Sequence, residues 1–405
     1  MAINNKVLNE GYSDLKLFSN TKNGKIVINN KSYYDLSNCA GSLILGHNSK
    51  IFKKSLINLN KKNVSNYAHP NHYAINLANL ISGKIRNINQ VIFCNSGTEA
   101  IYKALRLCRS INKKKYVVSA TGSWHGSVDQ FLYSQIKNKK VKMSEGLNKF
   151  EEKKLLFIPY NDIPNSLKIL NKFKKNINSI FIEPIQGCLP IDNMIGYLKF
   201  LEDYCRKNKI LLVFDEIITG FRLKKYSIQN KYNIKPDLTI LGKIIGGGMP
   251  IGAIGVNKNI VKKNSLQNIF FGGTFSGNSI SCFVGFETLK FITQNKNIIS
   301  KINKRSSEFQ KNLNLFFNQN NIDAKVYRHE SILRIIFSKK RIYNRTVRDF
   351  FEKKKLNKIS KLRSFLYEKR IIYPKSGIIF FASSFSNKDF DYICNAFKKG
   401  LKKVF

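Results

Sequence analysis

The sequence predicts an α/β protein with a largely parallel sheet, because short apolar runs alternate with helical patterns through the middle of its 405 residues. Continuous apolar runs are typical of strands that are buried on both faces. The intervening segments place apolar residues three and four positions apart, as an amphipathic helix does. In such sheets ligands bind beyond the carboxyl ends of the strands, so we expect the functional residues there.

The first strand and helix of this series show the pattern clearly. Residues 90–97 (QVIFCNSG) form an apolar run that ends in small residues, and residues 98–109 (TEAIYKALRLCR) carry apolar side chains at helical spacing. The same patterns predict the remaining elements of the series, which are strands at 114–122, 178–187, 209–220 and 236–243 and a helix at 197–208.

After about residue 290 the pattern changes to that of a smaller α+β domain. It predicts a Lys-rich helix at 353–370, two short strands around a turn at 371–386 and a closing helix at 389–404. We expect residues 24–37 to form a hairpin around Asn29-Asn30 and to join this part. The predicted division is an N-terminal segment at 1–45 that packs with the small domain, a large domain at 46–288 and a small domain at 289–405.

The composition argues against a nucleic-acid-binding, zinc-binding, secreted or membrane-spanning protein. A net charge of +45 would suit a protein that binds nucleic acid or a membrane surface, but Lys is spread along the whole chain and no nucleic-acid motif is present. This distribution favours a compositional bias with some attraction for anionic ligands. The seven cysteines are dispersed without zinc-like spacing, which indicates reduced thiols and no metal site. The start lacks the apolar core of a signal peptide, and no apolar run could span a bilayer. We therefore expect a cytoplasmic protein that binds neither membrane nor nucleic acid.

Ser96, Gly97 and Thr98 lie where a predicted strand turns into a helix. Free backbone N–H groups and the helix dipole at such a position favour a bound phosphate. The same residues are also typical of an ordinary helix N-cap, with Glu99 in the first turn. Taken alone, the motif favours the cap.

Two other strand ends carry carboxylates, and a nearby loop carries an aromatic side chain. Asp215, with Glu216 beside it, could present a fixed negative charge to a cationic group of a ligand, or could be a surface pair. Glu183 and Gln186 occupy a similar position. The only tryptophan, Trp124, lies with His125 among small residues, and an aromatic ring there suits stacking on a planar ligand or ordinary packing.

Lys243 follows the apolar run LTIL and precedes three consecutive glycines. Desolvation lowers the pKa of a lysine amine and makes it a nucleophile toward carbonyl carbon. An exposed loop lysine is the alternative. Pyridoxal 5'-phosphate (PLP) requires four features together: a phosphate site, an aromatic side chain that stacks on its ring, a carboxylate and a nucleophilic lysine.

The sequence resembles class III PLP-dependent aminotransferases, in particular the glutamate-1-semialdehyde 2,1-aminomutase branch. The similar segments are LILGH (43–47), NSGTEA (95–100), WHG (124–126), EPIQG (183–187), FDEIITGFR (214–222), PDLTILGKIIGGGMPIGAIG (236–255) and GGTFSGNSIS (272–281). The resemblance implies fold type I, a large domain with a mostly parallel seven-stranded sheet plus a smaller α+β domain. It also implies a homodimer with shared active sites.

The resemblance also implies a role for each matching residue. Lys243 would form the Schiff base, the internal aldimine, and Asp215 would pair with the pyridine nitrogen. Ser96, Gly97 and Thr98 would hold the phosphate, and Trp124 would stack on the ring. The remaining implied contacts are Gln186 near the phenolic oxygen, Thr274 at the phosphate of the neighbouring subunit, and Glu183, His125 and Arg222 in supporting positions.

Departures from the aminomutase pattern concern the substrate. No segment matches the N-terminal stretch whose Arg grips the substrate carboxylate, and Gly377 lies near the point where the aminomutase carries a Glu. The leading hypothesis is therefore an aminotransferase that acts on another aldehyde or ketone. The alternatives are the aminomutase itself, which makes 5-aminolevulinate, and a non-catalytic basic binding protein, against which Asp215 and Lys243 together argue.

Overall fold

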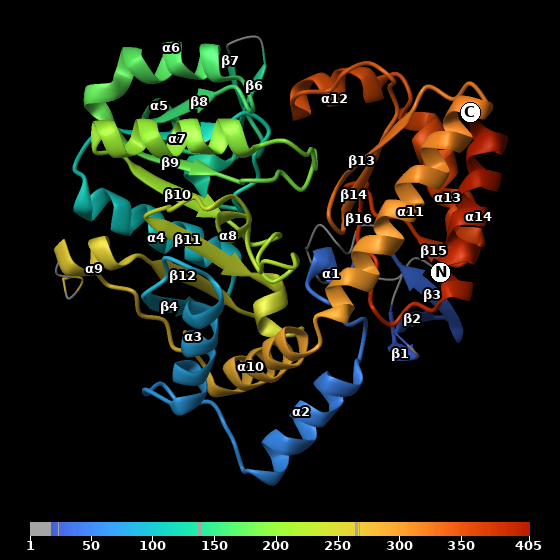
Figure 1. Cartoon of the computed structure of the whole chain (residues 1–405), viewed down its shortest axis with the longest axis horizontal. Helices are drawn as coiled ribbons and strands as arrows, with labels where there is room; N and C mark the ends of the chain where they lie inside the picture. Colours follow the sequence, from blue (N-terminus) through green and yellow to red (C-terminus); the bar gives the residue numbers. More distant parts are fainter. Residues whose placement is uncertain (1–17, 23, 137–138, 264–265, 267) are drawn as a thin grey trace.

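The computed structural model describes residues 18–22, 24–136, 139–263, 266 and 268–405. The first part of the predicted N-terminal segment, residues 1–17, lies outside the described residues. Figure 1 shows two parts side by side, one built around a large sheet and one around smaller sheets with α11, α13 and α14, with α1 between them. No helix in the described ranges combines the length and apolar character needed to cross a membrane.

The large sheet has seven strands among the described residues, in the order β4-β12-β11-β10-β9-β5-β8. All neighbouring pairs are parallel except those of β12, which runs antiparallel to β4 and β11. The predicted fold class is thus confirmed. The strands are β4 (Gln90–Cys94), β5 (Tyr116–Ala120), β8 (Leu155–Ile158), β9 (Ile177–Ile182), β10 (Leu211–Asp215), β11 (Leu238–Gly242) and β12 (Gly252–Val256).

The sequence patterns did not assign β8 and β12. β8 has only four residues, and β12 carries two glycines, which are unfavourable in strands. Both glycines have a packing reason. A Cβ at Gly252 would lie 2.1 Å from the carbonyl oxygen of Ser96, and one at Gly255 would lie 2.5 Å from Ile88 Cδ1. The strand therefore approaches the start of α4 more closely than a side chain would allow.

Successive residues of a strand point to opposite faces of the sheet, and the apolar side chains on both faces of the large sheet pack against helices. Val213 packs in the cluster that contains the apolar face of α4 (Gly97–Ile111), whereas Leu212 and Phe214 pack with α7 (Ile195–Asn208). The other helical segments are α1 (Asn38–Gly41), α2 (Lys50–Lys61), α3 (His72–Lys84), η2 (Asp129–Phe131), α5 (Lys149–Lys154), α6 (Ile163–Phe173), η3 (Lys174–Asn176), α8 (Ile228–Tyr232), η4 (Lys243–Gly246), α9 (Lys258–Lys263), α10 (Ser279–Gln294), α11 (Asn297–Gln319), α12 (Arg345–Lys353), α13 (Leu356–Glu368) and α14 (Asn387–Val404).

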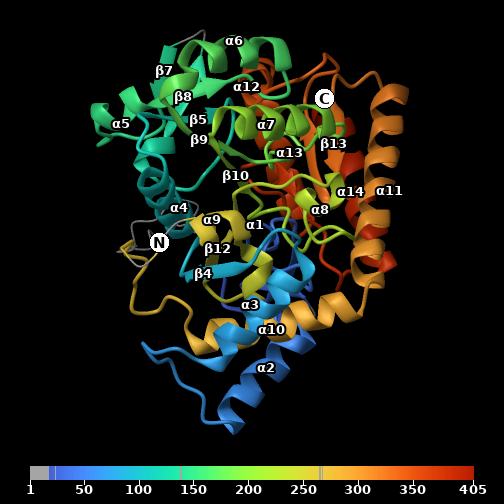
Figure 2. The ribbon, with the colours of Figure 1, turned by 60° about the vertical axis from the view of Figure 1, so that its left-hand side comes forward.

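α2 lies beside α10 at one end of the molecule, as Figure 2 shows. Leu59 of α2 packs there against Phe283 and Val284 of α10. α10 ends at Gln294 and α11 begins at Asn297. These two helices therefore connect the part built around the large sheet to the part that contains the small sheets.

The remaining strands form three small sheets, ordered β1-β2-β3-β15, β13-β14-β16 and β6-β7. The predicted hairpin is present, with Asn29 and Asn30 in the left-handed region at φ 47° and 60°. These strands are β1 (Asn20–Lys22), β2 (Lys25–Ile28), β3 (Lys31–Asp35), β6 (Tyr133–Ile136), β7 (Lys139–Lys142), β13 (Lys325–His329), β14 (Ile332–Ile336), β15 (Ile371–Ile372) and β16 (Ile378–Ile379).

The two strands predicted within 371–386 exist but are only two residues each, and they do not pair with one another. β15 runs parallel to β3, and β16 runs antiparallel to β14. The chain therefore crosses from one small sheet to the other at this point. Because β15 pairs with β3, the N-terminal strands share a sheet with the C-terminal part of the chain. The proposed domain boundaries themselves stay a prediction.

Candidate functional site

A cavity of about 450 Å³ lies at the carboxyl ends of the parallel strands. Seven of the residues singled out from the sequence line it, and they come from five separate segments of the chain. They are Ser96, Gly97, Thr98, Trp124, Glu183, Asp215 and Lys243. The fold thus brings together side chains that are up to 147 residues apart in sequence (243 − 96).

The start of α4 supports both interpretations of its sequence motif. The Ser96 hydroxyl accepts from the Glu99 N–H at 3.1 Å, as an N-cap does. The amides of Gly97 and Thr98 belong to the first helical turn, which has no intrahelical acceptors, and both residues line the cavity. The helix end is therefore capped and still offers N–H groups and its dipole to an anion.

Asp215 ends β10 and is held by two donors. Its Oδ2 lies 2.8 Å from His125 Nδ1, and its Oδ1 accepts from the Ile217 N–H at 3.1 Å. A carboxylate accepts from a ring N–H, so this contact suits the His125 tautomer that carries its proton on Nδ1. His125 Nε2 is buried and has no hydrogen-bond partner in the described part of the chain. His125 therefore orients Asp215 from behind while the carboxylate lines the cavity.

Glu183 holds the loop that carries Trp124 in place through two hydrogen bonds. It accepts from the Trp124 N–H at 2.8 Å and from the Gly187 N–H at 3.2 Å. Burial, followed by the nearby charge of Asp215, raises the pKa of Glu183 to about 7, against the opposing effects of His125 and these two bonds. Trp124 itself is 49% exposed and forms one wall of the cavity.

Glu216 has a different task from its neighbour Asp215. It is fully buried away from the cavity and accepts from the Thr219 hydroxyl and from the backbone of Ile228 and Gln229, at 2.7 to 2.9 Å. Burial raises its pKa to about 7. It supports the loop between β10 and α8 and does not reach the site.

Lys243 is the first residue after β11, and its backbone lies in the left-handed region with φ 52°. The left-handed region costs free energy for a residue with a Cβ and is found mainly where the surroundings enforce it, often at active sites. Burial lowers the pKa of the Lys243 amine, although the charges of Asp215 and Glu183 act to raise it. A lowered pKa increases the fraction of neutral amine, which is the nucleophilic form.

Arg222 lies behind the cavity as a buried cation. Its Nε donates to the carbonyl of Ile218 at 2.9 Å, its Nη2 donates to the carbonyl of Gly41, and its guanidinium stacks on the Phe380 ring at 4.5 Å. It forms no salt bridge within the described residues. Burial lowers its pKa to about 9, and its charge in turn acts to lower the pKa of Lys243.

This arrangement predicts that Arg222→Met shifts the reactivity of Lys243 to higher pH. Removing a nearby positive charge raises the pKa of the Lys243 amine, so less neutral amine is present at pH 7. The rate at which a small aldehyde and borohydride label Lys243, followed by mass spectrometry, should fall several-fold at pH 7 and recover at higher pH. Arg222→Lys keeps the charge and should stay close to the parent profile. Identical profiles for the parent and Arg222→Met would contradict the electrostatic role.

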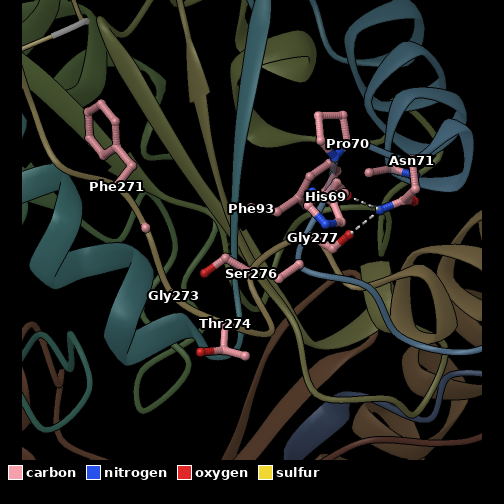
Figure 3. A pocket seen from close by; sticks show the side chains of 12 residues that line it. His69, Pro70, Asn71, Phe93, Phe271, Gly273, Thr274, Ser276 and Gly277 are labelled. Carbon is pink, nitrogen blue, oxygen red and sulfur yellow. Dashed lines mark hydrogen bonds between the residues drawn. The ribbon is translucent and has the colours of Figure 1, made fainter.

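Three of the cofactor-binding residues predicted from the sequence do not line this cavity, and one of them, His125, is the buried partner of Asp215 described above. Gln186 is fully buried behind the cavity, where its Nε2 donates to the Thr121 carbonyl at 3.0 Å and to the Ser123 hydroxyl at 3.2 Å. Its expected contact with a cofactor oxygen stays a prediction. Thr274 is exposed and lines a second pocket, of about 370 Å³, with Asn71 and Gly277, as Figure 3 shows.

The structure adds cavity residues that the sequence patterns did not single out. Ile217 lines the cavity two residues after Asp215, and Cys39 and Ser42 reach it from the N-terminal segment. Asn38, Cys39, Ala40 and Gly41 all have positive φ, so the backbone makes a left-handed turn beside the site. Ile217 is part of the FDEI motif and could have been found there. Cys39 and Ser42 carried no such signal, because only tertiary packing places them.

A family model described as aminotransferase class-III matches residues 8–355. The chain belongs to the class-III aminotransferase family. This class-III aminotransferase is 32% identical over 390 residues to a glutamate-1-semialdehyde 2,1-aminomutase of Thermosipho melanesiensis, covering 93% of this chain and 90% of the relative. A protein of the same name from Methanococcus maripaludis is 37% identical over 312 residues, covering 75% and 71%.

Solved structures share the fold of this class-III aminotransferase at lower sequence identity. An omega-transaminase from Sphaerobacter thermophilus matches with a TM-score of 0.87 at 20% identity, covering 96% of this chain and 91% of that one. A glutamate-1-semialdehyde-aminomutase from Pseudomonas aeruginosa matches with a TM-score of 0.84 at 15% identity, covering 96% and 88%. The expected resemblance and fold type I are thus confirmed.

Proposed function

We propose that this class-III aminotransferase uses PLP to move an amino group from a small amine donor to an aldehyde or ketone acceptor. The observation that carries the proposal is that Lys243, Asp215 and the first turn of α4 open into one cavity. A solved transaminase described as having PLP bound shares the fold, with a TM-score of 0.84 at 19% identity. The family and the cavity together support PLP as the cofactor.

The cavity residues fit the shape and charge of PLP. The amides of Gly97 and Thr98 suit a phosphate, and the Asp215 carboxylate suits a protonated pyridine nitrogen. Trp124 and Ile217 both line the cavity, so an aromatic and an apolar surface are available for a planar ring. Glycine packing maintains this shape, since a Cβ at Gly97 would lie 2.7 Å from Ile217 Cδ1.

Each protein group then has a distinct task. When bound, PLP supplies an aldehyde that condenses with amines and a ring that takes up electrons from the carbon bearing the nitrogen. Lys243 supplies the amine that holds the cofactor covalently, and, once displaced, its neutral amine accepts and returns protons at the substrate. Asp215 keeps a negative charge in place, and His125 keeps Asp215 oriented. Glu183 keeps Trp124 over the cavity through the Trp124 N–H.

The position of Gly377 supports an acceptor other than glutamate-1-semialdehyde. The resemblance implies a Glu near this position, but Gly377 has φ 71° and a Cβ there would lie 3.0 Å from Arg334 Nη1. Arg334 pairs instead with Glu352 at 3.2 Å. The side chains around Gly377 therefore differ from those that the aminomutase pattern implies at this point of the chain.

A donor and acceptor panel tests the proposal. We expect purified holoenzyme to lose its visible absorbance when an amino donor is added without an acceptor, and to regain it when a suitable aldehyde or ketone follows. The regained signal should match the amine product one to one. A protein that binds PLP but shows neither change with any donor would contradict aminotransferase activity.

The aminomutase reaction is the second candidate, because the curated relatives described above carry that name at 32% and 37% identity. In that reaction the amine moves within one substrate and no separate donor is consumed. Formation of 5-aminolevulinate from glutamate-1-semialdehyde without any added amino acid would favour it over the main proposal. Absence of this product, in a preparation that transfers amines in the panel, would exclude it.

We also propose a homodimer with shared sites. Thr274 is exposed and has no hydrogen-bond partner in the described part of the chain, and Phe270, Phe275 and Tyr102 are exposed close to it in sequence or in the fold. Exposed aromatic side chains that gather at one place favour a protein interface. A second copy on this face would cover them and bring Thr274 to the neighbouring cofactor phosphate, as the family resemblance implies.

A further inference from the structure

A buried lysine on α4 is not used by the site described above. The Lys103 side chain is 5% exposed, on a helix whose first residues line the cavity. A buried ammonium group is costly unless its charge and its three N–H donors are satisfied. Lys103 meets both conditions, because Nζ lies 2.7 Å from Glu99 Oε1, 2.8 Å from the Phe271 carbonyl and 3.2 Å from the Ser276 hydroxyl.

Two of these bonds hold a tight turn and a residue that leads into it. The Ser276 N–H donates to the Gly273 carbonyl at 2.8 Å, which closes a four-residue turn with Thr274 at its second position. Lys103 binds Phe271 before the turn and Ser276 within it. Gly273 lies directly above the ion pair, since a Cβ there would be 3.3 Å from Glu99 Oε1.

Two further bonds fix the loop from outside the turn. Arg106 Nη1 donates to the Phe270 carbonyl at 2.6 Å, and Asn71 Nδ2 donates to the Gly277 carbonyl at 3.0 Å. Figure 3 shows Thr274 on the bend between Phe271 and Gly277, with the Asn71 bond at the far end. The loop is thus held along its length while the Thr274 side chain is left exposed.

The same ion pair is also bonded to the backbone just before Ser96, Gly97 and Thr98, the proposed phosphate site. Glu99 accepts from Lys103 with Oε1, and its Oε2 accepts from the Asn95 N–H at 2.7 Å, immediately before Ser96. One ion pair, whose Lys103 side chain is buried, therefore ties the start of α4 to the turn that carries Thr274. A loop fixed in this way loses little conformational entropy when it binds a ligand.

We propose that Lys103, paired with Glu99, is a positioning residue that holds the turn Gly273–Ser276 so that Thr274 is presented to the cofactor phosphate of a second copy of the chain. This inference rests on the proposed function, because it assumes PLP and a shared site. Lys103 touches neither cofactor nor substrate and acts through Thr274.

A double-mutant cycle on cofactor affinity tests this role. The chain has one tryptophan, Trp124, which lines the cavity, so quenching of its fluorescence by added PLP reports binding to the cofactor-free protein without any turnover. Thr274→Ala should weaken PLP binding by about ten- to a hundredfold, the usual value of a hydrogen bond to a charged group. Lys103→Met should weaken it by several-fold, and the double variant should bind no worse than Thr274→Ala alone.

Controls separate positioning from general damage. Ser276→Ala removes only one of the three acceptors of Lys103, so it should fold normally and weaken binding less than Lys103→Met. Lys199→Met removes a charge from an exposed position on α7 and should bind as the parent does. Thermal unfolding of each cofactor-free variant identifies proteins that fail to fold.

The outcomes are distinguishable. Parental affinity in Lys103→Met, or losses that multiply in the double variant, would overturn the positioning role. Parental affinity in Thr274→Ala would overturn its premise that Thr274 meets the phosphate. Absence of any saturable quenching in the parent would instead contradict PLP binding, and with it the proposed function.

Discussion

Lys243→Ala is expected to abolish amine transfer, with kcat/KM lower by more than about 10³-fold, because no other amine among the described residues lines the cavity and could take both of its tasks. The cavity lining contains one lysine among its residues, and the arginine behind it, Arg222, is engaged by two backbone carbonyls. The same variant should still bind PLP through the phosphate and ring contacts, so cofactor content falls less than activity. Steady-state kinetics with the best donor and acceptor pair measure the effect.

A matched control is Lys199→Ala, which removes an exposed lysine on α7 and should keep parental kinetics. Turnover of Lys243→Ala within tenfold of the parent rate would remove Lys243 from the reaction. Partial rescue by a small added amine would support its role as a proton carrier, since an external base can enter the space that the side chain leaves.

Asp215→Asn is expected to lower kcat/KM by roughly 10²–10³-fold, the effect usually seen when one fixed electrostatic contact to the reacting group is removed. The neutral amide cannot hold a protonated ring nitrogen, and it also changes the bond to His125. Cofactor affinity should fall as well, and the visible spectrum of bound PLP should change. Kinetics and absorbance spectra of purified variants report the two effects separately.

Glu216→Gln is the control for this prediction, because Glu216 is the adjacent buried acid and supports a loop through Thr219, Ile228 and Gln229. It should lower the thermal unfolding temperature and leave the cofactor spectrum in place. If Glu216→Gln lost as much activity as Asp215→Asn with its fold intact, the assignment of separate tasks to the two acids would be wrong.

The fold could be predicted from local pattern wherever that pattern is strong. The run ending in Asp215 and the run ending at Gly242 are fully buried strands, as their continuous apolar residues indicated. β12 was not assigned, because Gly252 and Gly255 weaken its pattern for a reason that only tertiary packing reveals. The strands β15 and β16 were expected, but their partners β3 and β14 are far away in sequence, and local patterns carry no information on that pairing.

Some residues of the candidate site could be predicted from local sequence, whereas others are placed there only by tertiary packing. Residues at strand ends and in motifs, such as Lys243 and Thr98, could be predicted because the ends of parallel strands converge on one edge. Cys39 comes from a left-handed turn of the N-terminal segment, and nothing in its sequence indicates contact with the predicted site residues, the first of which is Ser96. Nothing in the sequence distinguishes Lys103 from the other basic residues among the 70, because its three acceptors come together only in the folded chain.

The most direct test of the account is to locate the covalent attachment of the cofactor. Purified protein saturated with PLP would be reduced with borohydride, digested and mapped by mass spectrometry. We expect one stoichiometric phosphopyridoxyl group, on the peptide that contains Lys243, and its loss in Lys243→Ala. A stoichiometric modification at any other lysine, or no modification of a protein that turns over, would contradict it.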